Sequence, residues 1–138
     1  MRSSLLFLFA LLGCAAAMRQ QAVGVEGQLL CGANPAAGVK VKLWEEDSGP
    51  DPDDMLQEAL TDAQGRFKLQ GSENELTPID PVFKAYHDCD DGITPGQRKI
   101  KFKIPGSYVS DGGVPKKFFD IGVLNLETIF PGEERDLY

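Results

Sequence analysis

Histidine is nearly absent from this chain, since His87 is the single one among 138 residues. A single histidine with no neighbouring nucleophile builds neither a Ser-His-Asp triad nor a metal centre. We therefore predict that the protein is not an enzyme and holds no cofactor and no metal. His87 has two interpretations. It is a structural residue hydrogen-bonded to Asp88 or to the backbone, or a pH-sensing or ligand-contacting residue.

Basic residues are also scarce: 14 lysines and arginines stand against 21 acidic residues, and the net charge is −7. Nucleic acid binds proteins largely through its phosphates, which favour a basic surface. The acidic balance therefore argues against a nucleic-acid partner.

Long apolar runs are lacking after the first residues. Residues 5–12 form one apolar run, preceded by Arg2 and followed by three alanines at 15–17. This order is typical of a secretory signal peptide. The alternative, a transmembrane anchor, needs about 20 apolar residues. We expect residues 1–17 to be a cleaved signal peptide and residues 18–138 to form one secreted, extracellular domain without a transmembrane segment.

Cysteine occurs three times. Cys14 lies in the predicted signal peptide, which leaves Cys31 and Cys89. Disulfides form in the oxidising compartments through which secreted proteins pass. We predict a Cys31–Cys89 disulfide, and two free thiols are the alternative.

Helical periodicity is absent, and short alternating runs separated by Gly, Pro and Asp take its place. Apolar residues at every second position indicate half-buried strands. The predicted strands are residues 23–31, 39–43, 55–61, 66–69, 82–87, 99–104 and 119–127, with an additional short edge strand at 108–109. Two of these strands form a hairpin around the turn at 62–65, and residues 71–81 are a polar connection. Seven or eight short strands at this spacing indicate an all-β protein, an antiparallel β-sandwich or barrel.

The predicted core consists of the apolar residues that face one side of these strands. They are Val25, Leu29, Val41, Leu43, Phe67, Leu69, Phe83, Ile100, Phe102, Ile104, Ile121 and Val123.

Several short motifs follow one another along the chain. They are Gly27-x-Leu29-x-Cys31, residues 38–45 (GVKVKLWE), residues 51–54 (DPDD), Thr61-Asp62-x-x-Gly65-x-Phe67, residues 79–81 (IDP), residues 86–89 (YHDC) and residues 119–127 (FDIGVLNLE). This series resembles the nematode transthyretin-like family over nearly all of the chain after residue 17. The resemblance implies a transthyretin-like or prealbumin-like β-sandwich that is secreted or at the cell surface, with no established common ligand. The carrier activity of vertebrate transthyretin is not implied, because no residue match transfers its site.

The chain departs from that family in one respect. Many members resemble one another in a second cysteine pair, which joins a Pro-Cys-Gln-Arg loop to the C-terminal region. Here the loop at 95–98 reads PGQR and the tail at 135–137 reads RDL. Both cysteines are missing together, which suits a lost disulfide rather than a stranded thiol.

Cations gather in one segment of this acidic chain. Lys99, Lys101 and Lys103 alternate with apolar residues, so all three lie on one face of a strand. Such a face can dock on phospholipid head groups or anionic glycans, or it is a solvent-exposed face or an edge that lysines protect from aggregation. Trp44 shares a face with two further lysines and is either an interface anchor or packed under the loop at 47–54. The candidate ligand-binding residues are Lys99, Lys101, Lys103, Arg98 and Trp44, with Lys116 and Lys117 shortly after the strand.

Two groups of aspartates are candidate calcium ligands, since calcium prefers carboxylate oxygens. The alternative is a pair of solvated acidic loops, because Asp is a common turn residue. The groups are Asp51, Asp53 and Asp54, and Asp88, Asp90 and Asp91.

From these observations we expect a secreted protein that binds or signals through an extracellular protein or an anionic cell surface. The alternative is a carrier of a small hydrophobic ligand. The sequence predicts no particular oligomeric state.

Overall fold

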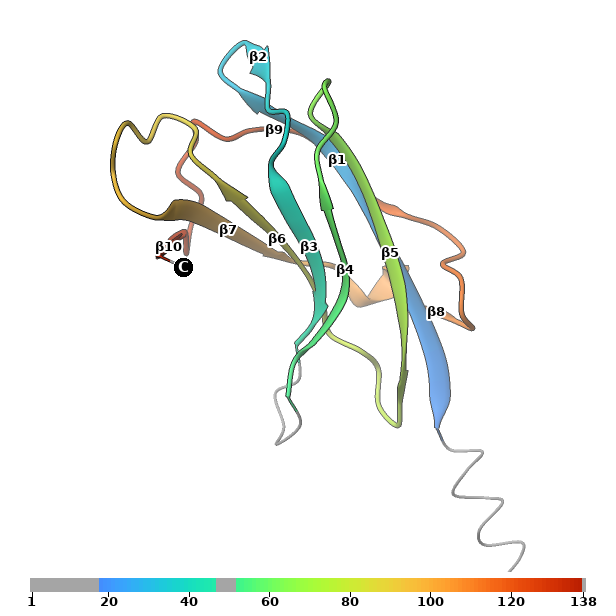
Figure 1. Cartoon of the computed structure of the whole chain (residues 1–138). Helices are drawn as coiled ribbons and strands as arrows, with labels where there is room; N and C mark the ends of the chain where they lie inside the picture. Colours follow the sequence, from blue (N-terminus) through green and yellow to red (C-terminus); the bar gives the residue numbers. More distant parts are fainter. Residues whose placement is uncertain (1–17, 47–51, 138) are drawn as a thin grey trace, which may run out of the picture.

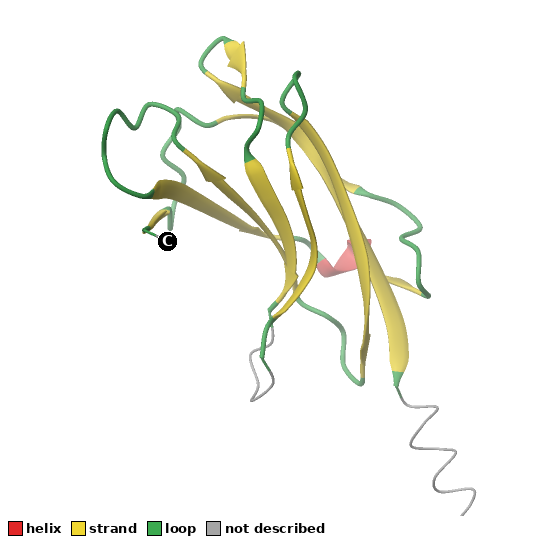
Figure 2. Cartoon of the chain, in the orientation of Figure 1, coloured by secondary structure: helices red, strands yellow, loops and turns green. Residues whose placement is uncertain are grey.

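Two β-sheets face each other in the computed structural model, which describes residues 18–46 and 52–137 (Figure 1). The predicted signal peptide and Asp51 lie outside these residues. Strands dominate the described chain, and the helical element in it is one short turn, η1 (Gly106–Tyr108) (Figure 2). No helix in the described ranges is long and apolar enough to cross a bilayer.

The first sheet is organised around β1 (Arg19–Cys31). Along one stretch β1 pairs antiparallel with β5 (Arg66–Glu75). It also pairs antiparallel with β2 (Asn34–Pro35) and β8 (Ser110–Asp111), and parallel with β9 (Phe119–Asn125). A single long strand therefore holds four others in place.

The second sheet is antiparallel throughout. Its order is β10 (Glu134–Asp136), β7 (Gln97–Lys103), β6 (Pro81–His87), β3 (Lys40–Glu45) and β4 (Asp54–Leu60). In Figure 1 this sheet lies across from β1 and β5, and the core fills the space between them. The predicted antiparallel β-sandwich is thus confirmed, with seven strands of six residues or more in the described chain.

The core is closed by aromatic stacking between the two sheets. The rings of Phe67 on β5 and Phe83 on β6 stack with centroids 4.7 Å apart. Around them, Leu29, Leu43 and Leu69 are completely buried. Burial of these side chains is the main source of stability in a domain of this size.

The predicted hairpin is wrong as a strand pair, although its turn is confirmed. Gly65 has φ +76° and donates its N–H to the Asp62 carbonyl at 2.9 Å. A Cβ at Gly65 would lie 2.1 Å from the carbonyl oxygen of Leu29, so the turn is pressed against β1. As a result β4 pairs with β3 while β5 crosses to β1, and β5 continues to Glu75 through the segment predicted to be a polar connection.

Two further expectations are wrong. Residues 108–109 form no edge strand, because η1 occupies residue 108 and β8 begins at Ser110. Val123 is 59% exposed instead of buried. Gly122 takes a positive φ of +75°, and the pairing of β1 with β9 slips between Glu26 and Gln28. This irregularity interrupts the alternation, and the completely buried Leu126 fills the core after it.

Replacing Phe83 by alanine is expected to lower the free energy of unfolding by about 3–5 kcal/mol, because the ring is fully buried and its removal leaves a cavity. Urea unfolding of the purified protein measures this change. The matched control is Ile129→Ala, since Ile129 is 77% exposed and such surface changes stay within about 0.5 kcal/mol. Equal effects of the two substitutions would contradict the described core.

Candidate functional site

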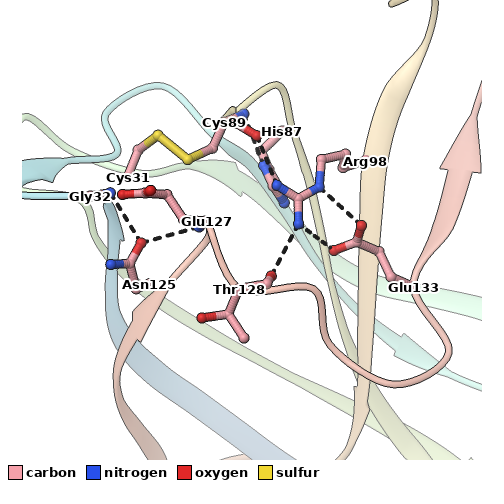
Figure 3. The surroundings of a disulfide bond; sticks show 9 residues. All are labelled: Cys31, Gly32, His87, Cys89, Arg98, Asn125, Glu127, Thr128 and Glu133. Carbon is pink, nitrogen blue, oxygen red and sulfur yellow. Dashed lines mark hydrogen bonds and ion pairs between the residues drawn. A yellow bond between two sulfur atoms is a disulfide. The ribbon is translucent and has the colours of Figure 1, made fainter. Parts of the chain in front are cut away.

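A disulfide joins the two sheets at one end of the sandwich, as predicted. Cys31 ends β1, Cys89 follows β6, and their Cα atoms are 5.7 Å apart (Figure 3). Asn125 lies beside this bond and accepts a hydrogen bond from the Gly32 N–H at 3.0 Å. The ends of β1, β6 and β9 therefore meet here, the first two joined through the disulfide and the third attached by the Asn125 hydrogen bond.

Arg98 is buried at this junction and does not lie on the face of Lys99, Lys101 and Lys103. Its guanidinium donates to the Cys89 carbonyl at 2.8 Å and to the Thr128 carbonyl at 3.0 Å, and it makes a two-pronged ion pair with Glu133 at 2.8 and 2.9 Å (Figure 3). The Arg98 side chain is 8% exposed. Arg98 is therefore a structural clamp, and we do not include it in the candidate ligand-binding surface.

His87 lies opposite Arg98 in the strand register and is 3% exposed. Its Nδ1 accepts a hydrogen bond from the Cys89 N–H at 3.1 Å. Asp88 is bound elsewhere, accepting from the Gln97 side chain at 3.2 Å. Burial lowers the pKa of His87 below its ordinary value, and the Arg98 charge lowers it further. This geometry favours the structural interpretation, with a neutral ring at pH 7.

The C-terminal segment is held at the place where many members of the resembled family have a second cysteine pair, which this chain lacks. A Cβ at Gly96 would lie 2.5 Å from the Asp136 carbonyl oxygen, so the loop at 95–98 and the tail touch. Arg135 donates to the Pro95 carbonyl at 2.8 Å and forms an ion pair with Asp91. The Arg135 guanidinium holds the pKa of Asp91 below its usual range. Ionic contacts thus join the two segments.

The outer surface of the second sheet carries a cluster that we call the lysine face. The strand registers place Lys40, Tyr86 and Lys99 in one row and Lys42, Lys84 and Lys101 in the next. A third row contains Trp44, Val82 and Lys103. The lysine face consists of Lys40, Lys42, Lys84, Lys99, Lys101, Lys103, Trp44 and Tyr86.

The second row of the lysine face sets three ammonium groups side by side, which is unfavourable without compensation. The Glu46 carboxylate offsets part of this repulsion, since it lies 3.2 Å from the Lys84 Nζ and 2.7 Å from the Lys101 Nζ. Burial raises the pKa of Glu46, but the hydrogen bonds from Lys101 and Lys84 outweigh it and the net change is downward. Glu46 is therefore an anion held among cations.

Aromatic rings supply the rest of the compensation. The Lys42 Nζ lies 4.9 Å from the Tyr86 ring centroid, and the Lys84 Nζ lies 4.7 Å from that of Trp44. Such cation–π contacts are attractive. Trp44 is consequently half-buried among lysine stems, and does not project freely from the surface.

The structure brings Lys99, Lys101, Lys103 and Trp44 together and leaves Lys116 and Lys117 apart. The last two lie between β8 and β9 of the other sheet, where the Lys117 Nζ is 4.8 Å from the Tyr108 ring. Sequence reasoning missed Lys84 and Tyr86. Their alternation with Phe83 and Ala85 is the signal that could have placed them outward.

Acidic side chains gather at the opposite end of β3 from the disulfide. Carboxylate oxygens of Glu45, Asp54 and Glu75 lie within 4.8 Å of one another. Nearby, burial and the Asp54 charge raise the pKa of Glu73. Of the predicted calcium groups, Asp54 joins this cluster, Asp51 lies outside the described residues, and Asp91 is engaged by Arg135. Calcium binding stays a prediction.

Two facing sheets joined by a disulfide make this protein a small, covalently linked β-sandwich. Residues 26–105 match the Transthyretin-like family, and the chain belongs to that family. It is 62% identical to Transthyretin-like protein 46 of Caenorhabditis elegans, over 99% of this chain and 77% of the relative. Transthyretin-like protein 33 of the same nematode is 49% identical over 96% and 92% of the two chains.

Among solved structures, a 9R-lipoxygenase from Cyanothece is similar over 80% of this chain and 17% of its own, with 22% identity and a TM-score of 0.41. That weak likeness bears on neither fold nor function.

Removing one partner of the Arg98–Glu133 pair is expected to be costly. Glu133→Ala leaves a buried guanidinium without its carboxylate, and the free energy of unfolding should fall by about 3–5 kcal/mol. The control is Glu26→Ala, whose partner Lys68 is 4.0 Å away with a side chain 64% exposed. An exposed pair of this kind contributes about 0–1 kcal/mol. Chemical denaturation of both variants makes the comparison, and a small loss for Glu133→Ala would refute the clamp.

The lowered pKa of His87 has a consequence for stability below neutral pH. The unfolded chain binds a proton near its ordinary pKa of 6.5, whereas the folded chain resists protonation. Stability is therefore complete above that pH and declines as the pH falls from it towards the folded pKa. His87→Asn keeps an acceptor for the Cys89 N–H and should flatten this decline. Urea unfolding at pH 7.5 and 5.5 measures the decline. An equal loss of unfolding free energy between the two pH values in the wild type and in His87→Asn would contradict this prediction.

Proposed function

We propose that this protein is secreted and binds anionic extracellular surfaces through the lysine face. The observation that carries the proposal is the collection of six lysines on one sheet surface of a chain whose net charge is −7. This uneven distribution concentrates positive potential on the lysine face, whereas the rest of the molecule is acidic.

Export is supported by two independent features. Residues 1–17 have the order of a signal peptide, and the Cys31–Cys89 disulfide is of a kind that persists in oxidising compartments. The names of the relatives mention no reaction, and the absence of enzymatic activity stays a prediction.

The geometry of the lysine face favours a broad, flat ligand over a small enclosed one. The Lys101 side chain is 42% exposed, and the Lys99 side chain, 21% exposed, places its Nζ 5.7 Å from the centroid of the Tyr86 ring. Each lysine near an anionic surface contributes about 1 kcal/mol of attraction. Carboxylates on the same face, those of Glu46, Glu58, Glu134 and Asp136, oppose part of this attraction. Binding should therefore need close docking and should weaken steeply with salt.

Sedimentation with liposomes containing anionic lipid tests the proposal. The secreted protein should bind at low ionic strength and ignore neutral liposomes, while the triple variant Lys99→Gln, Lys101→Gln, Lys103→Gln should lose about 3 kcal/mol of attraction at most, roughly a hundredfold in affinity. The matched control carries Arg66→Gln, Lys116→Gln and Lys117→Gln, which removes the same charge from the other sheet and its loops.

Equal binding by the two triple variants, with both folds intact by circular dichroism, would show that only net charge matters and would refute the lysine face. A heparin column run in parallel distinguishes an anionic glycan from a lipid surface as the preferred form of the ligand.

A further inference from the structure

The C-terminal segment of the described chain is attached to the second sheet by a short pairing. Residues 128–137, which we call the strap, contain β10, and β10 pairs with β7 over three residues. Before β10, the strap is attached to the Arg98 guanidinium, which donates to the Thr128 carbonyl at 3.0 Å and is paired with Glu133. Short elements with few attachments open locally more readily than the core strands of a fold.

His87 lies at the base of this attachment. It is the neighbour of Arg98 in the strand register, and both side chains are buried near the disulfide (Figure 3). The ring accepts the Cys89 N–H at Nδ1, so its own proton is on Nε2. That Nε2 is buried and has no hydrogen-bond partner among the described residues. The site therefore uses the ring as an acceptor and offers it no acceptor in return within the described chain.

A second proton on His87 would disturb the closed arrangement in two ways. Protonation at Nδ1 turns this nitrogen from an acceptor into a donor, and the donor then faces the Cys89 N–H. It also places a positive charge beside the Arg98 guanidinium, which already holds the strap. Both effects act at the residue through which the strap is attached.

The acids around His87 do not offset that charge, because each is engaged by another side chain. Glu133, Asp91 and Asp88 bind Arg98, Arg135 and Gln97, respectively. The closed form therefore resists the proton. This agrees with the pKa of His87, which burial and the Arg98 charge lower in spite of the three acids.

We propose that protonation of His87 in mildly acidic fluid releases the strap. In the open form the strap leaves Arg98, water reaches the ring, and His87 accepts a proton with its ordinary affinity. Below pH 6.5, each further pH unit favours the open form by up to about tenfold, because the closed form resists the proton that the open form binds. The Cys31–Cys89 disulfide stays intact, so the two sheets remain joined.

Release of the strap would also change the lysine face. The strap places Glu134 3.9 Å from the Lys99 Nζ. Burial raises the pKa of Tyr86 and the Asp136 charge raises it further, which shows that Asp136 acts on the same face. Without these two acids, the lysine face should attract anions more strongly at pH 5.5 than at pH 7.5. This consequence rests on the proposed function, whereas the release of the strap does not.

Hydrogen exchange of the purified, disulfide-bonded protein, expressed as protection factors for single amides, tests the release. At both pH 7.5 and pH 5.5, amides of β10 should be at least tenfold less protected than those of β3, as local opening requires. Between these pH values the β10 amides should lose about fivefold to tenfold in protection. His87→Asn keeps an acceptor for the Cys89 N–H and should abolish this loss.

Asp91→Asn is the matched control, because it breaks the ion pair with Arg135 and leaves His87 in place. It should lower the protection of β10 at both pH values and retain the fivefold to tenfold loss between them. Liposome sedimentation at the same pH values measures the lysine face separately. The wild type should gain more binding at pH 5.5 than His87→Asn does.

Four results would overturn the proposal. They are equal protection of β10 and β3, a loss of less than twofold in the wild type, an undiminished loss in His87→Asn, and a wild-type loss that starts only below about pH 4. The last would assign the opening to carboxylates, and it requires no variant to fold. Absence of liposome binding at both pH values would refute the proposed function, while hydrogen exchange alone decides whether the strap is released.

Discussion

The disulfide between Cys31 and Cys89 is the constraint on which the rest of the described structure depends. It joins the end of β1, the strand that holds the first sheet together, to Cys89. Cys89 comes just after β6, the middle strand of the second sheet. In the chain-entropy view, closing a loop of this length stabilises a fold by about 4 kcal/mol. Its position matters as much as its strength, because it fixes the distance between the sheets where the hydrophobic core ends.

The polar groups around the disulfide extend this constraint into the C-terminal segment. Arg98 binds the Cys89 carbonyl on one side and Glu133 on the other, so the last strand is anchored to the junction through one guanidinium. Buried ion pairs of this kind are costly to break and weak as a net source of stability. The arrangement therefore serves to specify where the tail lies more than to increase the stability of the core.

Much of the fold follows from alternation in the sequence. Ile100, Phe102 and Lys101 show the principle, since a period of two assigns apolar residues to the core and lysines to the outer face. The same rule, extended one step back, places Arg98 with Ile100 on the inner side. The charge of Arg98 favours grouping it with the lysines, but its position in the alternation places it on the inner side. At β9 the rule fails because Gly122 interrupts the strand, and Val123 is consequently exposed.

The candidate site was harder to predict, because its members come from different strands. The sequence shows Lys42, Lys84 and Lys101 as separate residues, and only the registers of β3, β6 and β7 align them in one row. Likewise nothing local connects Glu46 to Lys101, which is 55 residues away. Register and crossover depend on long-range packing, as the exchange of the expected β4–β5 hairpin for two separate pairings shows.

The contact between Gly96 and Asp136 has a consequence for how this molecule responds to its surroundings. A cysteine pair at such a place would make the tail's attachment a matter of redox conditions. Here the attachment consists of a glycine that allows close approach and an Arg135–Asp91 ion pair at the surface. Salt screens such pairs and acid neutralises their carboxylates. The attachment of the tail thereby depends on ionic strength and pH, whereas a reductant acts on the Cys31–Cys89 disulfide.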